Sequence, residues 1–276
     1  MTVMNEMIPA QAAAPPARLG RVLGDAARSA WDRLGLLLGV SFTWMAALSA
    51  PLSLERALPR GTPGVAHLAF IAAIPLFTAA PTAGAFALAH RIASHREAAY
   101  GDLWRDGVAH FGAALRLQYA QVAVTSLLVT ALVFYARIPA WPARAAVSLC
   151  GYVLLLWLMM LAVQWPLFIL QESGALDDAD RRARRGAIAA IRRSAFLALG
   201  RPFFSAALLA AAALITVAMA ATAVLPAILW AGVMAMLTTI ATRALLVEYG
   251  VLPPPPAQEP VPDLQFRIGD TAARRP

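Results

Sequence analysis

An apolar segment of 41 residues without a single charge, residues 202–242, constrains this chain more than any other feature of its sequence. At about 1.5 Å per residue, one helix of that length would measure about 60 Å. The hydrocarbon core of a bilayer is only about 30 Å thick. The segment must therefore turn, and Pro226 is the natural place for the turn. We predict two membrane spans here, 202–224 and 227–249.

Four other apolar segments are each long enough to cross a bilayer, which takes about 20 residues. They predict spans at 34–54, 65–89, 117–136 and 145–170. Only 14% of the residues are charged, against about 25% in soluble domains. Residues 18–250 are therefore predicted to form an all-α, polytopic transmembrane helical bundle of six spans, with the lipid bilayer as its surroundings. The first span is expected to be retained, because it is longer than the apolar region of a signal peptide.

The arginines predict the orientation of the spans. The chain has no lysine, and its net charge of +8 comes from arginines that lie between the apolar segments. This distribution is typical of membrane proteins and argues against nucleic acid as a partner. Eighteen arginines fall in residues 1–33, in the second and fourth connections and in the C-terminal tail, whereas four fall in the other connections. Cytoplasmic segments carry the excess of arginine, so both termini are predicted to lie in the cytoplasm.

Three segments outside the spans have the periodicity of amphipathic helices, which predicts surface helices on the cytoplasmic side. The apolar stripes comprise Leu19, Val22, Leu23, Ala26 and Ala30; Trp104, Val108, Phe111 and Leu115; and Ile188, Ile191, Ala195 and Ala198. A surface helix followed by a pair of spans thus recurs, which hints at an internal repeat. Residues 1–17 and the proline-rich residues 251–276 are predicted to be disordered tails.

The second span carries the most informative local sequence. Pro75 and Pro81 remove backbone donors and bend a helix. Thr78 and Thr82 can bond the carbonyls that the prolines leave free. One interpretation is a broken helix that lines a solute path; the other is a kinked helix that serves packing.

Two polar residues of later spans have the same two interpretations. Gln164 in the fourth span is a candidate for hydrogen bonding either a solute or a neighbouring helix. Arg243 in the last span is a candidate for binding a solute, or for reaching the membrane interface and pairing with Glu248. With Pro75, Thr78, Pro81 and Thr82, these two residues complete the candidate helix break or solute path.

The second span, followed by His90-Arg91 and by Tyr100-Gly101-Asp102-Leu103-Trp104-Arg105, resembles the YesL-type family of bacterial membrane proteins. Trp44 and Pro51 in the first span, and Arg201-Pro202 before the fifth, are also similar to its pattern. The resemblance covers roughly residues 30–250. It implies a polytopic protein of the bacterial inner membrane, often associated with carbohydrate-uptake genes, and it supplies no catalytic residues.

The sequence predicts no catalytic, metal or cofactor site. His90 and His95 are poorly spaced for a shared metal ion, and no nucleotide-binding or nucleophile motif occurs. The predicted function is a non-enzymatic component, accessory to uptake of a carbohydrate or small solute, with a membrane-protein partner or a second copy as candidate partners. A small-solute permease is the alternative. A membrane enzyme would need clustered acids or histidines, and only Asp102, Asp106 and His110 come close.

Overall fold

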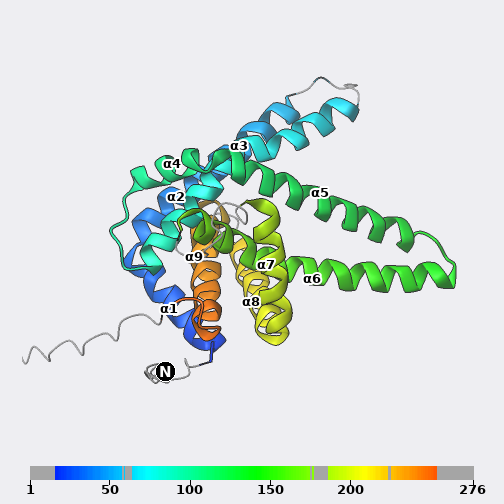
Figure 1. Ribbon diagram of the computed structural model, residues 1–276. Helices are drawn as coiled ribbons and strands as arrows, with labels where there is room; N and C mark the ends of the chain where they lie inside the picture. The colour runs from blue at the N-terminus through cyan, green and yellow to red at the C-terminus, as the bar shows by residue number, and fades with distance from the viewer. Residues whose placement is uncertain are drawn as a thin grey trace, which may run out of the picture.

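The computed structural model describes residues 16–57, 59, 64–174, 176, 186–222 and 225–253. These residues form nine α-helices and no strand (Figure 1). The helices are α1 (Leu19–Asp32), α2 (Leu34–Arg56), α3 (Gly64–Ala93), α4 (Tyr100–Ala109), α5 (Phe111–Ala136), α6 (Trp141–Glu172), α7 (Ala187–Gly200), α8 (Pro202–Ala220) and α9 (Leu225–Glu248). Most of the two predicted tails lies outside the described residues.

Six of these helices are long and apolar enough to cross a membrane: α2, α3, α5, α6, α8 and α9. They coincide with the six spans predicted from hydropathy, so the prediction of an all-α polytopic bundle is confirmed. The chain is an integral, multi-pass membrane protein. In the 202–249 region the turn precedes Pro226, which lies in the first turn of α9. Proline is tolerated there because the first N–H groups of a helix have no partner within it.

The three predicted surface helices correspond to α1, α4 and α7, but one boundary was wrong. The stripe from Trp104 to Leu115 was predicted as one helix. It is divided instead, because α4 ends at Ala109 and α5 begins at Phe111, with His110 in a non-helical conformation between them. Trp104 and Val108 are exposed, and α4 buries Leu103 and Gly107 against α3.

The nine helices form three consecutive units, each a short helix followed by a hairpin of two long ones: α1–α3, α4–α6 and α7–α9. The same contacts recur in every unit. Each short helix packs on the last helix of the unit before it, α4 on α3, α7 on α6 and, closing the ring, α1 on α9. The last helices of the units, α3, α6 and α9, also contact one another. The described helices are thus arranged with an approximate threefold repeat.

The core lies where the C-terminal halves of α3, α6 and α9 meet. Large, fully buried side chains there include Leu88, Phe168 and Leu245. The other ends of the hairpins diverge from this core (Figure 1), and little of the most apolar stretch of α5, of α6 and of α8 is buried inside the protein. Apolar side chains such as Leu127 and Leu214 are exposed along these helices, which suits contact with lipid.

One polar contact recurs in all three hairpins: an indole N–H of one helix donates to a threonine hydroxyl of the other. The distances are 3.0 Å from Trp44 to Thr82, 2.9 Å from Trp157 to Thr125 and 3.0 Å from Trp230 to Thr216. In a membrane, where water does not drive helices together, such hydrogen bonds help to hold two helices in register.

Candidate functional site

Neither proline interrupts α3, which is one helix from Gly64 to Ala93. The hydroxyl of Thr78 donates to the carbonyl of Ile74 at 2.9 Å, and that of Thr82 donates to the carbonyl of Thr78 at 2.6 Å. The carbonyls freed by Pro75 and Pro81 are four residues before each proline, at positions 71 and 77. The expectation that the threonines bond those freed carbonyls is therefore wrong.

The two threonines instead connect α3 to its neighbours. Thr78 accepts a hydrogen bond from the amide of Gln118 on α5 at 2.7 Å, and Thr82 accepts the one from Trp44 on α2. Both threonines are buried. In the structure, Thr78 and Thr82 therefore join three helices.

Gln164 lies in a second polar cluster, between α5 and α6. Its side-chain oxygen accepts a hydrogen bond from Gln121 at 2.8 Å, and the oxygen of Gln121 accepts one from the indole of Trp165 at 3.1 Å. Gln164 is fully buried, and Trp165 packs in the apolar core beside it. The indole of Trp165 thus donates to Gln121, and Gln121 donates to Gln164.

Three glutamines of α5 and α6 have enclosed side-chain atoms without a hydrogen-bond partner in the described part of the chain. These atoms are Oε1 of Gln118, Nε2 of Gln164, and both Oε1 and Nε2 of Gln171. A buried polar atom without a partner costs about 1–3 kcal/mol. The three amides are therefore where a small polar molecule inside the bundle would find donors and acceptors.

Arg243 lies apart from both clusters, between α9 and the end of α3. Its Nη1 donates to the hydroxyl of Ser94 at 2.5 Å and lies 3.5 Å from Nδ1 of His90. The predicted pairing with Glu248 is wrong: Glu248 pairs with Arg201 at the start of α8 and accepts a hydrogen bond from the backbone of Ala17. The candidate residues thus form three separate groups: Thr78 with Thr82, Gln164, and Arg243.

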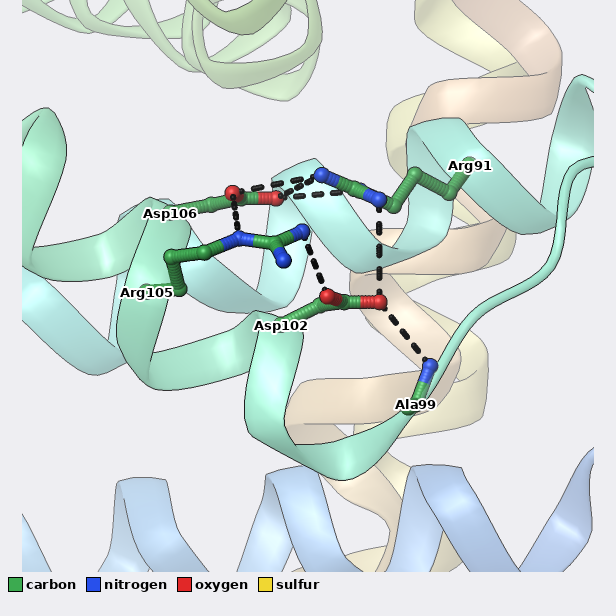
Figure 2. Close-up of polar contacts among 5 residues, drawn as sticks. All are labelled: Arg91, Ala99, Asp102, Arg105 and Asp106. Atoms are coloured by element: carbon green, nitrogen blue, oxygen red, sulfur yellow. Dashed lines mark hydrogen bonds and ion pairs between the residues drawn. The ribbon is translucent and has the colours of Figure 1, made fainter.

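An ionic cluster between α3 and α4 was not predicted as a site. Figure 2 shows Arg91, at the end of α3, between Asp102 and Asp106 of α4. Arg91 contacts Asp106 with both Nε (3.0 Å) and Nη2 (2.9 Å), and its Nη1 lies 3.6 Å from Asp102. Arg105 closes the cluster, 2.6 Å from Asp102 and 3.5 Å from Asp106. The spacing of Asp102, Arg105 and Asp106 within one helical turn was the available signal, but it does not reveal the partner on α3.

This cluster fixes the start of α4. Asp102 also accepts the backbone N–H of Ala99 at 3.0 Å, which satisfies a donor at the helix N-terminus. That hydrogen bond, with the charges of Arg91 and Arg105, lowers the pKa of the Asp102 carboxyl. The side chains of Asp102 and Asp106 are only 14% and 16% exposed. Both carboxylates are paired with arginines, an arrangement suited to fixing the position of a helix.

Among the residues that the structure describes, no group of three histidines, cysteines or acids is placed to hold a metal ion. The ring of His110, which the sequence placed beside the two aspartates, packs edge-on against Phe168, with the ring centres 6.5 Å apart. The histidine and the aspartates therefore make different contacts.

Comparison with family models, with curated proteins and with solved structures gives no match to this chain. The resemblance to the YesL-type family stays a prediction.

Proposed function

We propose that this protein is a non-enzymatic membrane component of YesL type, accessory to a carbohydrate or small-solute uptake system. The resemblance implies the bacterial inner membrane, and the arginine distribution predicts that both termini lie in the cytoplasm. One observation carries the proposal: the span residues that would line a solute path have protein partners instead. Thr78, Thr82 and Gln164 are buried and hydrogen-bonded to neighbouring helices.

A solute path requires polar groups that exchange their partners with the solute. The hydroxyls of Thr78 and Thr82 are each engaged both as donor and as acceptor. Opening these contacts would leave buried polar atoms unpaired in a medium without water, at about 1–3 kcal/mol each. Fixed contacts of this kind favour a structural role for the bundle.

The outer surface of α7 supports contact with another membrane protein. Ile188 is 84% exposed, and Phe196 and Leu199 are exposed on the same helix. Arg192 lies over the ring of Phe196, with its guanidinium carbon 5.9 Å from the ring centre. Exposed aromatic and arginine side chains are enriched where proteins bind one another.

The ion-paired carboxylates support the non-enzymatic part of the proposal. Asp102 and Asp106 are the acids that an enzyme acting at the membrane interface would use, and both form ion pairs with arginines. A general acid or base needs a pKa near the working pH, whereas the pKa of Asp102 is lowered.

Two measurements test the proposal. The full chain, reconstituted in liposomes, is expected to give no sugar flux above that of empty liposomes. The resemblance predicts that an uptake permease is encoded beside it, and this permease is expected to copurify with the wild type and to be lost with Phe196→Ser. Trp31→Ser, which removes an exposed aromatic side chain from α1, is the matched control and should retain the permease. Flux by the chain alone, or equal recovery with both variants, would contradict the proposal.

A small-solute permease is the second candidate, favoured by the unpartnered amide atoms of Gln118, Gln164 and Gln171. In that case the liposomes conduct the solute, and Gln164→Leu abolishes conduction because it removes the buried donor. The same flux assay therefore separates the two functions.

A further inference from the structure

Arg243 is a membrane-embedded arginine without a carboxylate partner among the described residues. It lies on α9 beside the end of α3, where its Nη1 contacts Ser94 and His90. The hydroxyl of Ser94 itself donates to the carbonyl of His90 at 2.7 Å. Ser94 thus bonds a carbonyl at the end of α3, and the guanidinium of Arg243 is not needed for that purpose.

Most of the donors of Arg243 remain available. A guanidinium has five N–H donors in a planar fork, and both contacts of Arg243 use Nη1. Its Nε and Nη2 make no hydrogen bond to the described residues, and they are not among the enclosed polar atoms without a partner. One edge of the fork is therefore held by the protein and the other remains accessible.

A second unpaired arginine lies nearby. Arg96, in the connection between α3 and α4, is exposed and close enough to both Arg243 and His90 for its charge to act on them. The contrast with Arg91 is clear, because Arg91 has two aspartates as partners. Arg243 and Arg96 thus leave positive charge uncompensated at one place on the surface.

These residues lie near the ends of their helices, and the ends of membrane-spanning helices reach the level of the lipid headgroups. Arg243 is five residues before the end of α9 and His90 is three before the end of α3, distances of about 7.5 Å and 4.5 Å along the helices. Basic pockets at the ends of membrane helices bind the phosphates of anionic lipids. A guanidinium fork also fits two phosphate oxygens at once.

We propose that Arg243 and Arg96, beside Ser94 and His90, form a binding site for a phosphate group. Arg243 supplies its free edge, held in orientation by Ser94, and Arg96 adds a second cation from the loop. The phosphate comes from the headgroup of an anionic phospholipid or from a soluble phosphate. This inference is independent of the proposed function.

The test uses the full chain, purified in a nonionic detergent, with thermal unfolding followed by tryptophan fluorescence. Separate titrations use phosphatidylglycerol, phosphatidylcholine and inorganic phosphate, at constant ionic strength. We expect phosphatidylglycerol or inorganic phosphate to raise the Tm in a saturable way, and phosphatidylcholine to raise it less. A response to phosphatidylglycerol alone identifies a lipid headgroup as the ligand, whereas an equal response to inorganic phosphate identifies a soluble one.

Three variants complete the test. Arg243→Gln is expected to raise the half-saturating concentration about tenfold, as loss of one charge-assisted hydrogen bond would. Arg96→Gln should weaken binding while it leaves the contacts of Arg243 with the protein in place, so it decides the matter should Arg243→Gln fail to fold. Arg116→Gln is the matched control, since it removes an exposed arginine that bonds only a carbonyl of its own helix. The proposal is overturned if no probe shifts the Tm of the wild type, or if Arg96→Gln responds like Arg116→Gln.

Discussion

Gly84 on α3 and Leu103 on α4 lie so close together that a Cβ atom at Gly84 would stand 2.1 Å from the carbonyl oxygen of Leu103. Gly107 makes the reciprocal approach, since its Cβ would stand 2.4 Å from the carbonyl oxygen of Ala80. Close contact of backbones through small residues is a common way for helices to associate in membranes. The short helix α4 is thus seated on α3 by two glycines, one on each helix.

Replacing Gly84 with alanine should therefore destabilise the protein. The obstructing atom belongs to the backbone, so α3 and α4 must separate, and overpacking of this kind costs about 1–3 kcal/mol. We expect a lower Tm in detergent for Gly84→Ala. Gly101→Ala on α4 is the control, because nothing lies within 4 Å of its added Cβ. Equal Tm values for the two variants would contradict the close approach.

The ion pair of Arg91 with Asp106 should contribute more to stability than that of Arg105. Asp106 receives two donors from Arg91 and is 16% exposed, whereas Arg105 is 64% exposed. Loss of a hydrogen bond to a charged group costs about 1.5–3 kcal/mol, while an exposed ion pair is worth about 0–1 kcal/mol. We expect Asp106→Asn to lower the midpoint of denaturant unfolding markedly and Arg105→Gln to lower it little. The reverse order would show that Arg91 does not anchor α4.

Asp102 should make the stability depend on acidic pH. Its pKa is lowered in the folded protein by the N–H of Ala99 and by two arginines. The unfolded chain therefore binds the proton more tightly. The stabilisation is fully present above the unfolded-state pKa of about 3.9 and is lost as the pH falls through the lower pKa of the folded state. We expect the Tm of Asp102→Asn to be lower than that of the wild type at pH 6 and to approach it at low pH. Parallel pH profiles would exclude this role.

The spans could be predicted from the sequence because lipid demands about 20 apolar residues in succession, and that requirement is local. Helix contacts are not local. Glu248 was predicted to pair with Arg243, five residues away on the same helix. The packing of α8 on α9 instead brings Glu248 into an ion pair with Arg201. Likewise, the apolar period from Trp104 to Leu115 does not show the break at His110.

The repeat illustrates the same distinction. The order of a surface helix followed by two spans is visible in the sequence, and it hinted at the repeat. The ring closure of α1 on α9 joins the first unit to the last, and no local pattern encodes it. The contact of Trp44 with Thr82 also has its donor on the first helix of the hairpin, whereas Trp157 and Trp230 lie on the second. The recurring link is thus visible only in three dimensions.

The link between Trp44 and Thr82 should be measurable by a double-mutant cycle. Thr82→Val leaves the indole N–H without an acceptor, and Trp44→Phe removes the donor. Interhelical hydrogen bonds in membranes are worth about 0.6 kcal/mol on average and up to about 1.7 kcal/mol. We expect a coupling free energy in this range from unfolding in mixed micelles. Strictly additive effects of the two substitutions would show that the hydrogen bond contributes nothing.

The predicted orientation can be tested with single cysteines, because Cys150 is the only cysteine of the chain. In a Cys150→Ala background, Ile138→Cys places a thiol in the connection between α5 and α6, and His95→Cys places one between α3 and α4. The arginine distribution predicts that the connection between α5 and α6 lies outside and that the connection between α3 and α4 lies in the cytoplasm. A membrane-impermeant thiol reagent should therefore label Ile138→Cys in intact cells, and His95→Cys only after the membrane is permeabilised. Labelling in the reverse order would contradict the side of the membrane assigned to α4 and to the arginines around it. The prediction of six spans would stand, because hydropathy is the same for either orientation.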